Sequence, residues 1–351
     1  MPPRRRKSGE VTTSEANPER PTTSGNENEN EAANPEPAKK KSRSGQRKKA
    51  PASAEALKKR NENAPANATV ENEGGEDDER AGDLFDLLQS SGQAVVLTAG
   101  EWRKRYGESE ISAIAEIYSL LCKASGCSTG VTAIELQRSD CLTIMNRIVT
   151  DMAAGSLYGE DPLSRRSNDF KGFRDNFLDF IDKAMRESAE SEQLYDGTLF
   201  ASWAEIVITC AGSKARPLRM AATTMALQTI TSLITVVNNL QTSRDLKQNQ
   251  IEIESKKAKS DVEVLKSLNR IIDSAQEQIE LVEKYIQELF TKVFTHRFRD
   301  CDESIRAACM TALGKWMMKH QLVFLTDFYL KYLGWSLNDK SASVRLEVLV
   351  A

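Results

Sequence analysis

The 96 residues between Pro217 and Gly314 contain neither proline nor glycine, which restricts this part of the chain to long helices. From Leu265 to Val293, apolar residues recur at alternating steps of three and four. That spacing is typical of a helix packed lengthwise on another helix.

The partner of this helix is expected to precede it in the chain. Residues 221–240 are strongly apolar, whereas residues 241–260 are polar and are expected to hold a bend. We therefore predict a long antiparallel helical hairpin over residues 217–292. A parallel dimeric coiled coil is the alternative.

Composition changes sharply near residue 80. Residues 1–80 contain eight of the ten prolines and no Phe, Trp, Tyr, Ile or Cys. Such a segment cannot bury enough apolar surface to offset the entropy of ordering its backbone, so we predict a disordered charged tail. After residue 80, hairpin turns and period-two alternation are hard to find, which predicts an all-α body.

Charge is segregated along the tail. Residues 1–60 carry a net charge of +7 and residues 61–80 one of −6. Lysines and arginines cluster at residues 4–7, 39–49 and 58–60, as in nuclear import signals or loose nucleic-acid contacts. A merely solubilising tail is the alternative.

Several classes of function are disfavoured by composition. No run of 18 apolar residues occurs, so we expect no membrane partner. The dispersed cysteines favour reduced thiols in an intracellular protein, and Cys122, Cys127 and Cys141 lack a fourth zinc ligand. With only His296 and His320, and no Gly-rich phosphate loop or nucleophile elbow, we expect neither a cofactor nor enzymatic activity.

Residues 81–216 are expected to form a region of shorter helices. Apolar positions recur at helical spacing over residues 110–122, 170–184 and 198–210. Pro217 suits the first turn of the following helix, where its missing N–H needs no partner.

A short pattern recurs toward the C-terminus: an Asp, then an aliphatic residue five positions later, then an Arg. It occurs at residues 300–306 and 339–345, and a weaker copy lies at residues 213–219. The pattern resembles the turn between helices of HEAT repeats and predicts an α-solenoid. We expect the Asp to cap the next helix and the Arg to reach the neighbouring turn's carboxylate. Because the last apolar helix face is left open, we also expect a fragment of a longer solenoid.

The helix expected over residues 327–337 has two different faces. One face is predicted to form the core stripe and holds Tyr329, Leu330, Leu333 and Leu337. The opposite face holds Asp327, Lys331 and Trp335, with Phe328 beside them. Aromatic side chains outside the core, rimmed by an acid and a base, fit a pocket for an aromatic-bearing peptide. Packing of Trp335 on a further repeat is the alternative.

Several of these segments resemble one known family. The segments Phe294-Thr-His-Arg-Phe-Arg-Asp-Cys-Asp-Glu-Ser-Ile-Arg-Ala and Tyr329-Leu-Lys-Tyr-Leu-Gly-Trp-Ser resemble the stromalin conservative domain of the stromal antigen (stromalin, SA/STAG-type) family of cohesin subunits. Upstream, Phe170-Lys-Gly-Phe-Arg-Asp-Asn-Phe and Arg216-Pro-Leu-Arg-Met are similar to segments near the family's long helices. The resemblance covers about residues 84–351, and it assigns residues 293–351 to a truncated, HEAT-like conservative domain.

The resemblance implies a non-catalytic cohesin subunit that binds the kleisin chain and double-stranded DNA and supports sister chromatid cohesion and chromosome segregation. It implies a nuclear, chromatin-associated protein. It also implies a pocket for Phe-containing motifs of cohesin regulators, such as shugoshin or Wapl-type proteins. The matching positions are Phe298, Asp327, Lys331 and Trp335, and Phe298 stands where the animal proteins carry Tyr.

DNA contact in this family uses basic grooves that bind phosphates. The candidates here are Lys214, Arg216 and Arg219, of which Arg219 also occupies the repeat position. Further lysines, Lys256, Lys257 and Lys259, cluster in the long-helix region. Because the body from residue 81 has a net charge of −4, DNA binding must use a local patch. A generic nuclear HEAT-type scaffold or transport adaptor is the alternative function.

Overall fold

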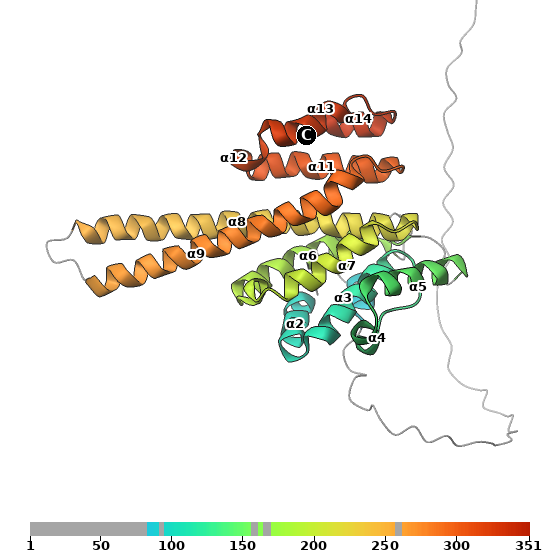
Figure 1. Ribbon diagram of the computed structural model, residues 1–351, viewed down its shortest axis with the longest axis horizontal. Coiled ribbons are helices and arrows are strands. Elements are labelled where there is room, and N and C mark those ends of the chain that lie inside the picture. The colour runs from blue at the N-terminus through green and yellow to red at the C-terminus, as the bar shows by residue number, and fades with distance from the viewer. Residues whose placement is uncertain (1–82, 91–94, 156–160, 164–169, 257–261) are drawn as a thin grey trace, which may run out of the picture. The chain divides into compact units, whose positions relative to one another are not determined.

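The computed structural model describes residues 83–90, 95–155, 161–163, 170–256 and 262–351. By its contacts the chain divides into Met1–Asn72 and Glu73–Ala351, and all described residues belong to the second unit. Every regular element in the described ranges is a helix, which confirms the predicted all-α class (Figure 1). The predicted tail over residues 1–80 lies outside these ranges.

The N-terminal part consists of short helices, as predicted. They are α1 (Leu84–Ser90), α2 (Val95–Glu108), α3 (Glu110–Ala124), α4 (Ala133–Arg138), α5 (Cys141–Ala153), α6 (Phe173–Glu190), the 3₁₀ turn η3 (Gln193–Tyr195) and α7 (Leu199–Ala211). The helix predicted over residues 170–184 begins later than expected, because Gly172 adopts a left-handed φ of 84° at its N-cap.

Trp102 on α2 lies at the centre of these helices. Its ring meets the ring of Trp203 on α7 at 6.0 Å and that of Phe180 on α6 at 6.2 Å, both edge to face. Its indole N–H donates to the carbonyl of Ala113 at 2.9 Å. The buried indole is therefore packed and hydrogen-bonded at once.

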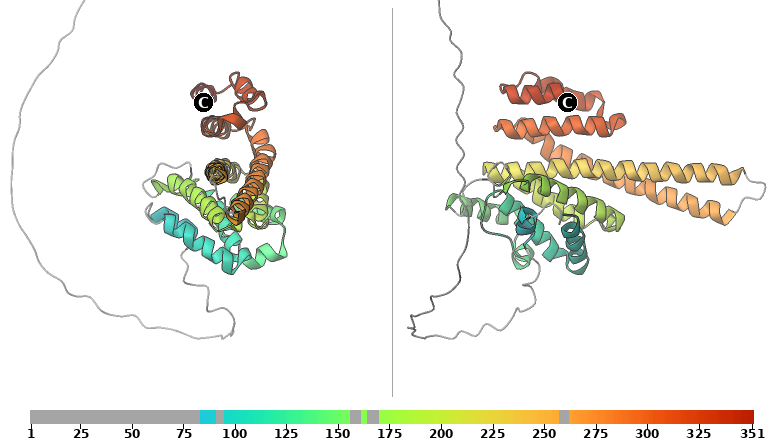
Figure 2. Two further views of the ribbon diagram at one scale, coloured as in Figure 1. Left: turned by 90° about the vertical axis from the view of Figure 1, so that its left-hand side faces the viewer. Right: turned by 180° about the vertical axis from the view of Figure 1, so that it is seen from behind.

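The long hairpin is formed by α8 (Arg216–Ser255) and α9 (Val262–Leu289), which share the most extensive helix contact in the described chain. Figure 2 shows the two helices side by side, with their far ends extending beyond the other helices. The predicted seam of α9 is buried from Ala275 to Leu289. Because α8 of the same chain covers that seam, the antiparallel hairpin is confirmed over the dimeric coiled coil.

The bend expected within residues 241–260 does not occur before Ser255, because α8 continues to that residue, and residues 257–261 lie outside the described ranges. An 18-residue window of α8 also has a mean hydropathy of 1.5, so its length and composition would suffice to cross a membrane. However, 89% of that window is buried by the protein itself, which makes α8 a core helix.

The C-terminal part stacks on α8 in layers. It comprises the π-helical turn η4 (Phe290–Phe294), α10 (Thr295–Arg297), α11 (Glu303–Lys319), α12 (Gln321–Phe324), α13 (Asp327–Ser336) and α14 (Ala342–Val350). Helix α11 packs on α8, and α14 packs on α11 (Figures 1 and 2). This layering agrees with the predicted HEAT-like solenoid. The boundaries proposed at residues 216/217 and 292/293 stay a prediction.

Candidate partner-binding surfaces

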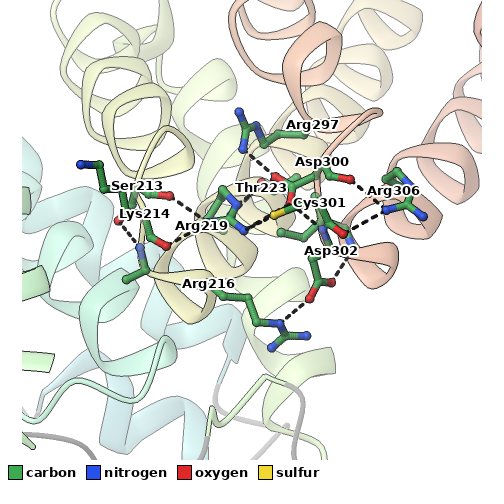
Figure 3. A network of polar contacts seen from close by, with 12 residues as sticks. Ser213, Lys214, Arg216, Arg219, Thr223, Arg297, Asp300, Cys301, Asp302 and Arg306 are labelled. Carbon is green, nitrogen blue, oxygen red and sulfur yellow. Dashed lines mark hydrogen bonds and ion pairs between the residues drawn. The ribbon is translucent and has the colours of Figure 1, made fainter. Parts of the chain in front are cut away.

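The repeated arginine of the sequence pattern bridges successive layers (Figure 3). The side chain of Arg219 is 9% exposed and that of Asp300 1% exposed. Arg219 donates through Nε and Nη2 to the Asp300 carboxylate, at 2.9 and 3.2 Å. In the next layer Arg306 makes the same two bonds to Asp339, at 2.7 and 2.8 Å. The predicted reach of the Arg to the neighbouring turn's carboxylate is confirmed for Arg219 and Arg306.

All three copies of the pattern use one backbone arrangement. Each Arg donates through Nη1 to the carbonyls six and five positions earlier. The acceptors are Ser213 and Lys214 for Arg219, Asp300 and Cys301 for Arg306, and Asp339 and Lys340 for Arg345. The weak third copy is therefore structurally equivalent to the other two.

The predicted capping role of the aspartates is wrong. Asp302, not Asp300, caps α11 by accepting from the N–H groups of Ser304 and Ile305 at 2.9 and 3.3 Å. Asp300 accepts from the N–H of Asp302 at 2.9 Å and so closes the turn before the cap. Asp339 accepts likewise from the N–H of Ser341 at 2.8 Å. The repeat aspartate therefore organises the turn and holds the neighbouring Arg.

These contacts keep the aspartates ionised. Burial would raise the pKa of Asp300, but the Asp302 N–H and Arg219 bring it below its ordinary value. At Asp302, burial likewise would raise the pKa, but the hydrogen bond from Arg216 and its charge bring the pKa below its ordinary value. The hydrogen bond from Arg306 lowers the pKa of Asp339. The turns are thus charge-assisted contacts that weaken when a carboxylate is protonated.

The three DNA-contact candidates differ in accessibility. Arg219 is held in the buried network, and Arg216 pairs with Asp302 at 2.6 Å and Asp161 at 3.8 Å. Lys214 is exposed and contributes only its carbonyl to the network of Figure 3, with no ion pair to a described residue. Lys256 is exposed at the opposite end of α8, about 60 Å away at the helical rise of 1.5 Å per residue. Lys257 and Lys259 lie outside the described residues.

Three of the four predicted pocket residues come together around Tyr332. The ring of Phe298 stacks on that of Trp335 with centroids 6.2 Å apart and planes at 26°. The ring of Tyr332 meets both edge to face, at 4.9 Å from Phe298 and 5.5 Å from Trp335. We call Phe298, Phe328, Lys331, Tyr332 and Trp335 the aromatic surface.

Lys331 lies among the rings of this surface. Its Nζ is 4.2 Å from the ring centroid of Phe328, 5.1 Å from that of Tyr332 and 5.8 Å from that of Trp335. Such distances allow cation–π attraction. Asp327 is exposed one helical turn earlier, and it makes no ion pair with Lys331 or any other described residue.

The aromatic surface is supported by a row of phenylalanines in η4 and at the end of α10, directly after α9. Phe290, Phe294 and Phe298 follow at steps of four, with stacked neighbours 4.7 and 6.1 Å apart. Phe290 and Phe294 are fully buried, whereas Phe298 is only partly covered. The row therefore leads from the core to the surface through the π-helical turn, a distortion often found at functional sites.

The predicted core face of α13 is only partly right. Tyr329 is buried and Leu333 is half-buried, but Leu330 and Leu337 are 40% and 47% exposed. Tyr332, which the sequence prediction missed, is buried instead, with its ring 5.3 Å from that of Phe294. The two tyrosines determine the packing because they meet an aromatic row rather than an aliphatic helix. Trp335 still points outward, with 58% of its surface exposed.

The buried thiols of Cys141 and Cys210 are poor nucleophiles. Across the described ranges, no group of three or more His, Cys, Asp or Glu side chains is placed to hold a metal ion. Burial raises the pKa of Cys141 and of Cys210 to about 12. Both thiols therefore stay protonated and behave as small apolar side chains.

Comparisons with known proteins agree with this architecture. Residues 159–271 match the family model of the STAG domain, and residues 299–351 match that of the stromalin conservative domain. The chain is 35% identical over 268 residues to sister-chromatid cohesion protein 3 of Arabidopsis thaliana, covering 76% of this chain and 24% of that protein. It is 30% identical over 271 residues to cohesin subunit SA-3 of Rattus norvegicus, covering 77% and 21%.

A solved structure shares the fold. The cohesin subunit Scc3 from Z. rouxii, residues 88–1035, matches with a TM-score of 0.70 at 24% identity, over 76% of this chain and 32% of that chain. The chain thus spans about a quarter of the length of the curated relatives it matches, 24% and 21% in the two cases above.

Proposed function

Because the chain belongs to the stromalin family of cohesin subunits, we propose that it is a non-catalytic scaffold that joins a cohesin complex at chromatin in the nucleus. Two relatives support this assignment, cohesin subunit SA-3 of Rattus norvegicus and cohesin subunit psc3 of Schizosaccharomyces pombe. Its partners would be the kleisin subunit, double-stranded DNA and regulators carrying Phe motifs. Together these contacts would support sister chromatid cohesion and chromosome segregation.

Binding of a Phe-motif peptide rests on one observation, the exposed ring of Trp335 stacked beside Phe298 with Lys331 among the rings. A phenylalanine side chain could stack on these rings, while Lys331 could meet a carboxylate of the same peptide. Asp327 carries the only carboxylate among the predicted pocket residues, and we propose that it faces a basic group of the peptide. Phe298 would contribute its ring face without a phenol hydroxyl.

The test is the affinity of a Phe-motif peptide for the chain with Trp335→Ala. We expect roughly a tenfold or greater loss, as for removal of a central aromatic anchor. Leu322→Ala is the matched control, since Leu322 is 93% exposed on α12 and makes no ring contact. Undiminished affinity of a folded Trp335→Ala variant would overturn the assignment.

For DNA, we propose that Lys214 makes the phosphate contact and that Arg216 supports it. Arg219 has a structural role in this proposal because its guanidinium is buried against Asp300. Lys214→Glu is the cleaner test, since reversal of Arg216 would place a second acid beside Asp302. We expect weaker duplex binding with a salt-dependence slope reduced by about 1. An unchanged slope would remove this site.

Association with kleisin separates this proposal from a generic nuclear scaffold or transport adaptor. A pull-down with the kleisin subunit should retain the chain, and nuclear transport factors should not. The opposite pattern would favour the adaptor. Because the chain spans only about a quarter of its relatives, a full-length relative is the positive control.

A further inference from the structure

Two cavities flank the outer face of α7, and their linings contain none of the residues of the two surfaces described above. Helix α7 lies between α5 and α9 (Figure 1). One cavity, of about 350 Å³, lies toward α3, α4 and α5, and the other, of about 300 Å³, lies toward α9. Glu205 of α7 lines both. Since Ala201 and Glu205 are exposed, no described segment covers this face.

The first cavity has an excess of negative charge. Its lining includes Glu110, Asp140 and Glu205 but no Lys or Arg, and none of the three forms an ion pair with a described residue. Two other carboxylates of these helices are paired, Glu116 with Arg105 at 2.7 Å and Glu135 with Arg147 at 2.6 Å. The lining of the first cavity therefore keeps the net negative charge of Glu110, Asp140 and Glu205.

The rest of the first cavity is largely aliphatic. Ile111, Ile114, Leu136 and Ile206 contribute to its lining. An aliphatic wall with carboxylates at the rim matches a long side chain that has an apolar stem and a cationic head. Arg fits better than Lys, because its planar guanidinium can donate to two carboxylates at once.

The second cavity has a different character. Phe200 and Tyr285 stack face to face at its wall with centroids 3.8 Å apart, and Ile208 lies beside them. Lys292 donates to Glu288 at 2.6 Å, which leaves Glu205, shared with the first cavity, as the unbalanced charge of this lining. This cavity suits an apolar side chain.

The geometry points to a docking groove across α7 for a basic peptide segment of a partner protein. An Arg enters the first cavity and an apolar residue enters the second. A helix is about 10 Å wide, and an extended peptide advances about 3.3 Å per residue. The two anchors are therefore about three residues apart, as in Arg-x-x-Leu.

The inference is tested by fluorescence anisotropy with the full chain and labelled 12-residue peptides in a Gly-Ser background. The first peptide carries Arg-x-x-Leu, and the second has citrulline, a neutral isostere, in place of Arg. We expect saturable binding of the first peptide and about tenfold weaker binding of the second. Failure of the chain to bind the Arg peptide, or equal affinity for both, overturns the proposal.

Variants of the chain locate the binding. Glu205→Gln and Glu110→Gln should each lower the affinity for the Arg peptide about tenfold. Glu283 is an exposed residue of α9 that lines neither cavity, so Glu283→Gln should leave this affinity unchanged. Circular dichroism melting identifies any variant that fails to fold. If the folded Glu205→Gln and Glu110→Gln variants both bind as the parent does, the peptide does not occupy this groove.

Discussion

Arg219 connects the turn before α8 with the turn before α11. Its guanidinium makes five hydrogen bonds, two to the Asp300 carboxylate, two to carbonyls of its own turn and one to the Cys301 sulfur. Arg297 adds a second cation to Asp300 at 2.6 Å. Because these groups are removed from water, the arrangement is stable only while every partner is present.

Asp300→Asn should therefore destabilise the protein strongly. The substitution leaves the buried Arg219 without its counterion, a loss of about 3–5 kcal/mol in the free energy of unfolding. Urea denaturation followed by circular dichroism measures it. Asp245→Asn is the matched control, since Asp245 is 65% exposed in its pair with Arg244 and should cost less than about 1 kcal/mol. Equal effects of the two changes would contradict the structural role of the buried pair.

At the scale of elements, periodicity predicted where the helices lie better than which faces they bury. The three-and-four spacing of α9 correctly identified its seam with α8. The same logic misplaced Leu330 and Leu337 and missed Tyr332, because the face that α13 buries depends on the aromatic row of Phe290 and Phe294. That row comes from another part of the chain, so the local pattern of α13 carried no sign of it.

In the candidate sites, too, the local sequence pattern predicts some contacts but not those that depend on how distant helices pack. The exposure of Trp335 could be predicted from its helical phase, and the ion pairs of Arg219 and Arg306 from the repeat. The pairing of Arg216 with Asp302 could not, because neither residue occupies a repeated Asp or Arg position of the pattern and the pair depends on how α11 packs on α8.

The seam of the hairpin should differ in strength along its length. Ile279 is 2% exposed where other helices also surround α8, whereas Leu268 is only half-buried toward the free end. Ile279→Ala should lower the free energy of unfolding by about 2–5 kcal/mol, and Leu268→Ala by clearly less. Urea denaturation of the two variants makes the comparison. Similar losses would show that the far end is packed as tightly as the near one.

At the scale of the whole described body, α8 joins two groups of helices. It packs against α3, α6 and α7 on the N-terminal side and against α11 on the C-terminal side. Apolar contacts form most of this core, but the turns between α8, α11 and α14 are also held by Arg–Asp contacts at Asp300, Asp302 and Asp339. Layer stacking therefore has an electrostatic component that pH can remove.

Acid should weaken the stacking of these layers before it affects the apolar core. The pKa values of Asp300, Asp302 and Asp339 are all lowered in the folded protein, whereas an unfolded Asp titrates near about 3.9. The unfolded chain then binds more protons, so this stability is fully present above about pH 4 and is lost as pH falls through the lowered values. Denaturation at a series of pH values from 6 to about 2.5 should show the decline in the free energy of unfolding.

Asp339→Asn should make this decline shallower because an amide does not titrate. Asp245→Asn, which changes an exposed ion pair, should leave the slope of the decline unchanged. A decline that is identical in Asp339→Asn and the parent would mean that other carboxylates control the acid response.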